Sequence, residues 1–200
     1  MTFIIFIISY LIGALPLSYF IVKIISGKDI TSEGSGNVGT LNAYLVTKNK
    51  IIGISILLFD VLKAIFALWI IKSIFGITFQ HITVASIGVL IGHKFNIFLK
   101  FKGGIGLASA LGLVLMINYL PLLIWGIVWV IGKIITKNMD KSIISASIFS
   151  IILIWIMPES YLNIFNSCII LEIKEIRILI SIINILILLS PIFYKDKTKN

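Results

Sequence analysis

Long apolar runs constrain the fold of this chain more than any other feature of its sequence. A helix needs roughly 20 apolar residues to cross the hydrocarbon core of a bilayer, and these runs lack the short alternating pattern of membrane β-strands. They predict an all-α, polytopic integral membrane protein in which residues 1–200 form a single membrane domain. The six runs cover approximately residues 3–25, 50–71, 82–99, 107–132, 142–157 and 176–194.

The composition agrees with lipid as the solvent of the folded chain. Hydrophobic residues make up 59% of the 200 residues, whereas a soluble domain usually contains about 45–50%. The net charge of +9 comes mainly from lysines between the apolar runs, where cytoplasmic loops of membrane proteins carry them. We therefore expect membrane lipid, and no nucleic acid, as a partner. The single cysteine, Cys168, excludes an intrachain disulfide.

The run 107–132 decides the topology, because Asn118-Tyr119-Leu120-Pro121 interrupts it. If it forms one span, the lysines of 133–141 and of the C-terminal tail lie opposite those of 94–102. If it forms two short or tilted helices, all these lysines share one side, which the positive-inside rule favours. We therefore predict about seven spans, with the N-terminus outside and the C-terminus cytoplasmic. Their approximate ranges are 3–25, 50–71, 82–99, 107–118, 121–132, 142–157 and 176–194.

A first glycine-rich loop, residues 29–42, lies on the predicted cytoplasmic side. It contains three glycines within six residues, together with several polar side chains. Glycine lets a backbone amide approach a ligand closely, and successive amides in such turns form anion-binding nests. The same residue types are also usual in a flexible connector, so spacing alone leaves both interpretations open. The candidate ligand-binding residues are Gly34, Ser35, Gly36, Asn37, Gly39 and Asn42.

A second glycine-rich loop on the same side leads directly into an apolar helix. Its segment Lys102-Gly103-Gly104-Ile105-Gly106 precedes a run that begins at Leu107. A glycine loop at a helix N-terminus is suited to phosphate, because free amides and the helix dipole both favour an anion. Lys100 and Lys102 would add positive charge to such a phosphate site. The same residues would also be expected in a simple glycine turn with cytoplasmic lysines, so this interpretation stays open.

Three ionisable residues lie within or beside the apolar runs. Asp60 and Lys63 are three positions apart in the second run and therefore lie on one helix face. Intramembrane charges are costly and usually face a partner or a cavity, so the two either neutralise each other or belong to a functional site. His93 is a core or interfacial histidine, or a residue that shapes the second loop. With no cluster of cysteines or carboxylates near it, we expect no metal site.

Together, the two loops resemble the motifs of the bacterial acyl-phosphate-dependent glycerol-3-phosphate acyltransferases, the PlsY family. Residues 34–39 with Asn42 are similar to the first motif of that family. Residues 92–93 and 101–108 are similar to the second. The order, the spacing, the length near 200 residues and the seven-helix topology agree as well. The resemblance is clear over residues 1–115 and rests on hydropathy beyond them.

The resemblance implies an enzyme that transfers a fatty acyl group from acyl phosphate to the 1-hydroxyl of glycerol 3-phosphate, giving lysophosphatidate in phospholipid synthesis. Acyl phosphate, glycerol 3-phosphate and membrane lipid would be its partners. It would be a multi-pass protein of the bacterial plasma membrane with a cytoplasmic active face. It would need no cofactor and no metal, and we expect a monomer. The resemblance also implies phosphate binding by Gly103, Gly104, Gly106, Lys100 and Lys102, catalytic roles for Ser35, Asn37 and Asn42, and supporting roles for Gly34, Gly36, Gly39, His93 and the Asp60-x-x-Lys63 pair.

Several positions depart from the family pattern and leave two other functions open. Ile105 stands where the second motif has lysine, and Thr31 and Leu45 stand where arginines flank the first. A third, C-terminal motif with histidine and arginine is not found. These differences leave open, as an alternative to the acyltransferase, a catalytically silent or repurposed relative that binds an anionic lipid or a phosphorylated ligand. The charged pair at 60 and 63 would instead suit a small membrane transporter or subunit.

Overall fold

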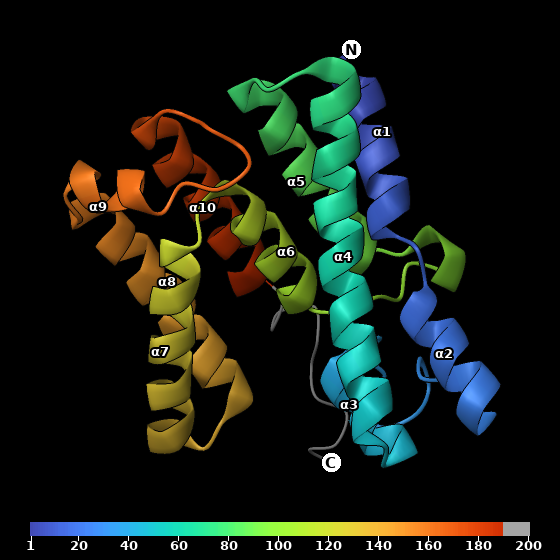
Figure 1. Ribbon diagram of the computed structural model, residues 1–200. Coiled ribbons are helices and arrows are strands. Elements are labelled where there is room, and N and C mark those ends of the chain that lie inside the picture. The colour runs from blue at the N-terminus through green and yellow to red at the C-terminus, as the bar shows by residue number, and fades with distance from the viewer. Residues whose placement is uncertain (190–200) are drawn as a thin grey trace.

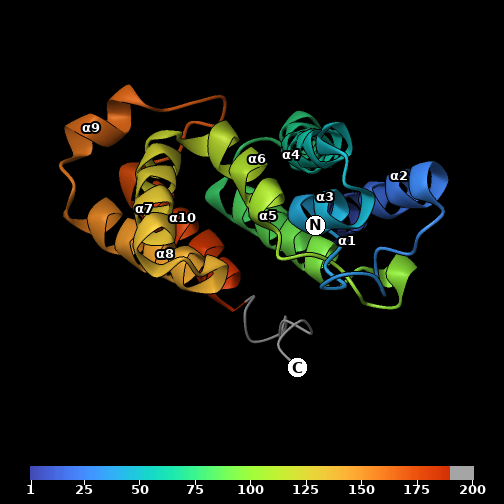
Figure 2. The same ribbon diagram turned by 90° about the horizontal axis from the view of Figure 1, so that it is seen from below.

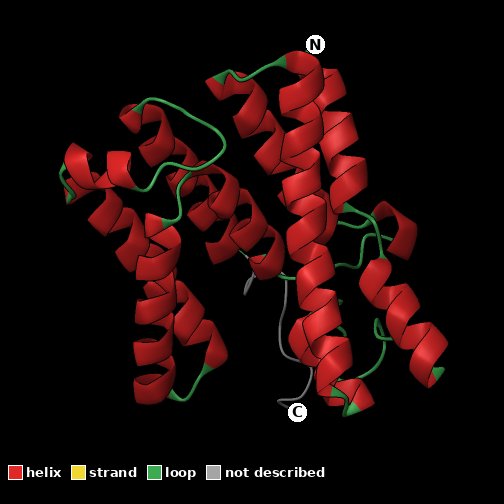
Figure 3. Ribbon diagram, in the orientation of Figure 1, coloured by secondary structure: helices red, strands yellow, loops and turns green. Residues whose placement is uncertain are grey.

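The computed structural model describes residues 1–189, and that part of the chain is a bundle of helices without a β-sheet (Figures 1 and 3). The predicted all-α class is therefore confirmed. In chain order the elements are α1 (Thr2–Gly13), α2 (Leu17–Ser26), α3 (Thr40–Thr47), α4 (Lys50–Phe75), α5 (Phe79–Lys94), the 3-10 turn η1 (Ile97–Leu99), α6 (Leu107–Ile117), α7 (Leu120–Thr136), α8 (Met139–Ile156), α9 (Glu159–Ile164) and α10 (Ile173–Leu188).

Within residues 1–189, four helical stretches are long and apolar enough to cross a membrane. They are Thr2–Ser26, Lys50–Phe75, Phe79–Leu99 and Met139–Ile156. Helices α6 and α7 are apolar but shorter, and α10 has 16 residues. The count of seven spans and the sides of the two termini stay predictions. The expected end of the last span at 194 and the tail residues Lys195, Lys197 and Lys199 lie outside the described residues.

The first apolar run is a pair of helices rather than one. Helix α1 ends at Gly13 and α2 begins at Leu17, so the predicted span 3–25 is not one continuous helix. Pro16 lies between them; a proline has no N–H to donate, and its ring clashes with the carbonyl four residues earlier. Figure 1 shows the chain changing direction at this point.

The run 107–132 is divided at Asn118 into α6 and α7, which overlap the expected segments 107–118 and 121–132. The Asn118 side chain is fully buried. Its Oδ1 accepts a hydrogen bond from the Leu120 N–H at 3.1 Å, and its Nδ2 donates to the Leu162 carbonyl of α9 at 2.7 Å. Because a helix break leaves backbone groups without partners, this asparagine stabilises the break.

Helices α1 and α5 lie side by side at close range because small residues face each other along their contact (Figure 1). Helix α5 has Gly88 and Gly92, four residues apart. A Cβ at Gly92 would overlap the Tyr10 carbonyl of α1, and a Cβ at Gly13 would overlap the Val89 backbone of α5. Small residues at such spacing let membrane helices approach closely and gain van der Waals contact.

Replacing Gly92 by Ala is expected to destabilise the protein by roughly 1–3 kcal/mol, the usual cost of overpacking. The new Cβ would overlap backbone atoms of Tyr10 and Ala14, which cannot move without displacing α1. Thermal unfolding in detergent measures the effect. Gly126→Ala in α7 is the matched control, because nothing lies within 4 Å of a Cβ at that position. Equal losses of stability in the two variants would contradict a close α1–α5 contact.

The described helices form two groups with α6 between them (Figures 1 and 2). Helices α1, α4 and α5 pack on one another in one group, and α8 packs on both α7 and α10 in the other. Helix α6 packs mainly against α4. Helix α3, the start of α4 and the turn between α7 and α8 lie at the end of the molecule opposite the N-terminus (Figure 1). The first glycine-rich loop lies toward this end, and the second lies nearer the middle of the molecule, where α6 begins (Figure 1).

Candidate active site

The two glycine-rich loops are far apart in sequence but meet in the structure. Residues 27–39 join α2 to α3, and residues 100–106 join η1 to α6. The Val38 N–H of the first loop donates a hydrogen bond to the Gly103 carbonyl of the second at 3.1 Å. The loops therefore form two walls of one site.

Asn42, near the start of α3, holds the first loop in its folded form. Its side chain is buried, its Oδ1 accepts from the Ser35 N–H at 3.0 Å, and its Nδ2 donates to the carbonyls of Ile30 at 3.2 Å and Glu33 at 3.0 Å. Gly34 has a φ of +59°, and a Cβ there would overlap the Asn42 Oδ1. The first loop therefore depends on both residues for its shape.

The same loop begins with a turn around Asp29. The Thr31 hydroxyl donates to the Asp29 carboxylate at 2.7 Å, and the Thr31 N–H donates to the same oxygen at 2.9 Å. These bonds, the one from the hydroxyl above all, hold the pKa of Asp29 below its ordinary value. The carboxylate is therefore ionised at neutral pH and keeps the turn closed.

The second loop packs on His93 through its glycines. The Gly104 N–H donates to the His93 carbonyl at 3.1 Å. A Cβ at Gly103 would overlap the carbonyl oxygens of His93 and Lys94, and a Cβ at Gly104 would overlap the His93 Nε2. Gly106 has a φ of +90° and is the N-cap of α6 without a side-chain cap. The first backbone amides of α6 are therefore suited to an anion.

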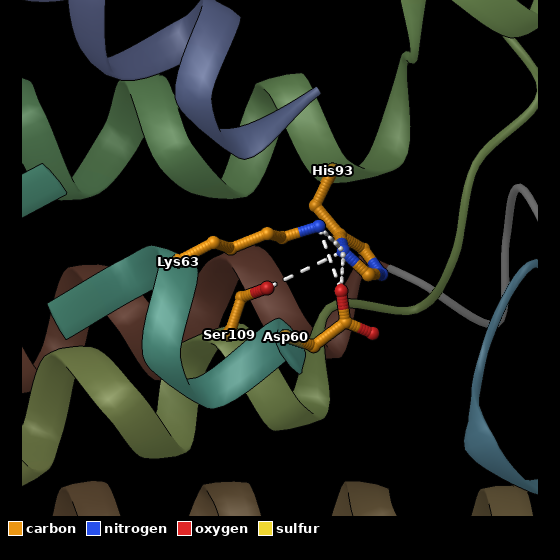
Figure 4. A network of polar contacts seen from close by, with 4 residues as sticks. All are labelled: Asp60, Lys63, His93 and Ser109. Carbon is orange, nitrogen blue, oxygen red and sulfur yellow. Dashed lines mark hydrogen bonds and ion pairs between the residues drawn. The ribbon is translucent and has the colours of Figure 1, made fainter. Parts of the chain in front are cut away.

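Behind this loop, Asp60, Lys63, His93 and Ser109 form a buried polar network (Figure 4). The Lys63 Nζ is 2.7 Å from the Asp60 Oδ1 and 2.9 Å from the His93 Nδ1. The Ser109 Oγ is 3.3 Å from the same ring nitrogen. Asp60 and Lys63 thus form an ion pair on one face of α4, and the pair also joins α4 to α5 and α6.

A cavity of about 620 Å³ opens between the two loops, α3 and α4. Asn37 lines it, and the side-chain oxygen of Asn37 is buried without a hydrogen-bond partner among the described residues. Because buried polar groups are nearly always hydrogen-bonded, this oxygen is a group that a bound ligand would satisfy. The predicted site residues that line the cavity are Asn37, Gly39, Asp60, His93 and Gly106.

The remaining predicted site residues do not line this cavity. Lys100 and Lys102 are exposed and are absent from its lining, whereas Lys50, the first residue of α4, is part of it. Nothing in the sequence around Lys50 except its charge indicates a site residue. Trp129, which also lines the cavity, has the sequence context of an ordinary tryptophan in a membrane span. The other predicted residues that are absent from the cavity lining are Gly34, Ser35, Gly36, Asn42, Lys63, Gly103 and Gly104.

A second, apolar cavity of about 370 Å³ adjoins the first. Leu57, Leu107, Ala108 and Trp129 line both cavities, and residues of α6, α7, α8 and α10 form the other walls of the second. A polar cavity that continues into an apolar one suits a ligand with a charged head and a hydrocarbon chain.

Known proteins share both the sequence pattern and the fold. A family model for glycerol-3-phosphate acyltransferase matches residues 3–194. The chain is 37% identical over 157 residues to the glycerol-3-phosphate acyltransferase of Pelagibacter ubique, over 78% of this chain and 80% of that protein. Its fold is similar to two crystal structures of PlsY, an integral membrane glycerol 3-phosphate acyltransferase. The glycerol 3-phosphate form has a TM-score of 0.74 and 24% identity over 96% of this chain and 88% of that one. The lysophosphatidic acid form has a TM-score of 0.73 and 23% identity over 95% and 87%. This chain belongs to the glycerol-3-phosphate acyltransferase family.

Proposed function

We propose that this protein transfers a fatty acyl group from acyl phosphate to the 1-hydroxyl of glycerol 3-phosphate, as the first acylation of phospholipid synthesis. The observation that supports this most directly is a cavity between both glycine-rich loops that adjoins an apolar cavity between helices. One substrate has a phosphate and a fatty chain, and the other is a small phosphate ester. A site for both needs anion binding next to a hydrocarbon-lined space.

Backbone amides and one lysine suit the binding of the two phosphates. Gly106 precedes the uncapped N-terminus of α6, where amides and the helix dipole favour an anion. Lys50 lines the same cavity and would attract both anionic substrates. The Asn37 carboxamide, with an oxygen that lacks a partner among the described residues, would accept a hydrogen bond from a substrate hydroxyl.

The proposed reaction joins the two substrates by acyl transfer. The 1-hydroxyl oxygen of glycerol 3-phosphate attacks the carbonyl carbon of acyl phosphate, and a new ester C–O bond forms. The bond from the carbonyl carbon to the phosphate oxygen breaks, and the hydroxyl proton ends on the departing inorganic phosphate. The protein holds the reactants together and stabilises the leaving phosphate with fixed donors. The acyl chain would lie in the apolar cavity beside Trp129.

We also propose that the cavity faces the cytoplasm and that the chain crosses the membrane about seven times. Lys50 at the start of α4 and Lys141 near the start of α8 belong to the end of the molecule opposite the N-terminus (Figure 1), which the positive-inside rule assigns to the cytoplasm. A monomer would suffice, because one chain supplies every residue that lines the two cavities.

An activity assay tests the proposed function. It measures the lysophosphatidate that the purified protein in lipid forms from acyl phosphate and glycerol 3-phosphate. Ser35→Ala is expected to lower turnover by about 10-fold or more, because the Ser35 hydroxyl accepts the Asn37 N–H and helps to position that side chain. Ser32→Ala, in the exposed part of the same loop, is the control. If folded wild-type protein binds inorganic phosphate but yields no product, the protein is instead a phosphate-binding relative.

Ile105→Lys is expected to lower the KM for acyl phosphate about 10-fold. Ile105 lines the cavity, and a hydrogen bond to a charged group contributes about 1.5–3 kcal/mol, which corresponds to a tenfold change or more. Initial rates at varied acyl phosphate measure the effect, and Ile105→Met is the uncharged control. An unchanged KM in the lysine variant would show that residue 105 does not face the bound phosphate.

A further inference from the structure

The buried network fixes which nitrogen of the His93 ring carries hydrogen. The Lys63 Nζ lies 2.9 Å from the His93 Nδ1 and 2.7 Å from the Asp60 Oδ1. A lysine ammonium has three donors and no acceptor, so the Nδ1 that faces it must accept. The Ser109 hydroxyl, 3.3 Å from the same Nδ1, can also only donate to it in this arrangement. The hydrogen of the neutral ring is therefore on Nε2.

Asp60 explains how the Lys63 ammonium can be buried beside the His93 ring. Its Oδ1 is 3.5 Å from the His93 Nδ1, and both atoms accept from the ammonium of Lys63 between them. A doubly protonated ring would direct an N–H at the Lys63 ammonium at hydrogen-bond distance, which is repulsive. The lysine thus selects the tautomer, and the aspartate balances the charge of the lysine.

The Nε2 of His93 points away from the network and lies against Gly104 of the second glycine-rich loop. Figure 4 shows this second ring nitrogen turned away from Lys63 and Ser109. It occupies the space where a side chain at residue 104 would stand, which explains the need for Gly104. His93 lines the 620 Å³ cavity, and the hydrogen bonds that its ring makes with Lys63 and Ser109 both involve Nδ1 and leave Nε2 available.

We propose that His93 is a fixed hydrogen-bond donor whose Nε2–H binds a phosphoryl oxygen of the substrate held by the second glycine-rich loop. Lys63, Asp60 and Ser109 are positioning residues that hold the ring in this tautomer. Because Lys63 occupies the Nδ1, the ring cannot pass a proton from Nε2 to Nδ1. Its role is therefore to bind the phosphoryl group rather than to act as a general base. This rests on the proposed function for the identity of the substrate but not for the tautomer.

Nitrogen NMR of the histidine rings tests the tautomer without turnover. The chain has two histidines, so a His81→Gln variant labelled with ¹⁵N-histidine reports on His93 alone. We expect a neutral ring with hydrogen on Nε2, and a shift of that N–H signal when glycerol 3-phosphate, inorganic phosphate or a non-reactive acyl phosphonate is added. Hydrogen on Nδ1, or a signal that none of the three compounds moves, would overturn the proposal.

Paired substitutions test the donor in catalysis. Glutamine can place an N–H near the position of Nε2, whereas methionine fills similar space without a donor. We expect His93→Met to lower kcat/KM by about 10–100-fold, as for the loss of a hydrogen bond to a charged group, and His93→Gln to recover most of that loss. Equal losses in two equally stable variants would mean that His93 only fills space, which contradicts the proposal.

The KM values of the His93→Met variant show which of the two substrates, acyl phosphate or glycerol 3-phosphate, carries the phosphoryl group that His93 binds. A rise in the KM for acyl phosphate assigns the Nε2–H to the donor substrate, and a rise in the KM for glycerol 3-phosphate assigns it to the acceptor. Either rise supports the proposal, and a change in neither KM, with kcat also unchanged, overturns it. If wild-type protein makes no lysophosphatidate but phosphate still shifts the His93 signal, the proposed function fails while the donor role stands.

Discussion

A Lys63→Met variant is expected to lose about 3–5 kcal/mol of stability, the usual cost of removing one partner of a buried ion pair. The remaining Asp60 carboxylate is 2% exposed, and it would keep only His93 as a neighbouring nitrogen group, at 3.5 Å. Methionine has nearly the length of the lysine stem, so the change removes the charge with little loss of volume. Thermal unfolding of the protein in mild detergent, followed by tryptophan fluorescence, measures the loss.

The double variant Asp60→Asn/Lys63→Met provides the control for this ion pair. Removing both charges leaves no uncompensated buried charge, so the double variant should be more stable than Lys63→Met alone. Residues in direct contact are expected to show such non-additive effects. If the effects of Asp60→Asn and Lys63→Met simply add, the two side chains are not coupled and the network described for α4 is not what stabilises this region.

An Asn42→Leu variant is expected to lose about 100-fold in kcat/KM, since small displacements of catalytic groups have effects of that order. Leucine has a similar size but cannot accept from the Ser35 N–H or donate to the carbonyls of Ile30 and Glu33. Each buried group left without a partner costs about 1–3 kcal/mol, so the first loop should unfold locally. Steady-state rates and limited proteolysis of the loop measure the two effects.

Two variants sharpen the test of Asn42. Asn163→Leu changes an exposed asparagine of α9 and should leave turnover unchanged. Asn42→Asp keeps an acceptor for the Ser35 N–H but loses the two donated bonds, so its activity should lie between those of the wild type and Asn42→Leu. Full activity in Asn42→Leu would show that the first loop does not depend on this side chain.

Features that depend on neighbouring residues in the sequence could be predicted, whereas features that depend on distant ones could not. Apolar runs and the interruption at Asn118 predict helices and a break, because both are local. The sequence does not show that Lys63 would meet His93, 30 positions later, or that Asn42 would turn inward to cap its own loop. Lys50 was missed as a cavity residue for the same reason, because only tertiary packing places it at the site.

Among the candidate site residues, membership of the site could likewise be predicted from the sequence, whereas the role of each residue could not. Two glycine-rich loops with Asp60 and His93 could be identified from spacing, and the structure brings them to one cavity. Their individual tasks follow from atoms that spacing does not specify. Gly104, for example, reads as a flexible residue in the sequence, yet its lack of a side chain makes room for the His93 ring.

The short length of α6 affects the fate of the activated acyl group. With 11 residues, the helix extends about 16 Å at 1.5 Å per residue, whereas the hydrocarbon core is about 30 Å thick. Its far end lies beside α9, on the side of the N-terminus (Figure 1), so in the proposed membrane orientation Gly106 would lie part-way into the depth of the bilayer. An acyl phosphate bound there would be kept away from bulk water, which would otherwise hydrolyse it. The depth of the site would then give a protection for which a soluble enzyme would need a closing lid.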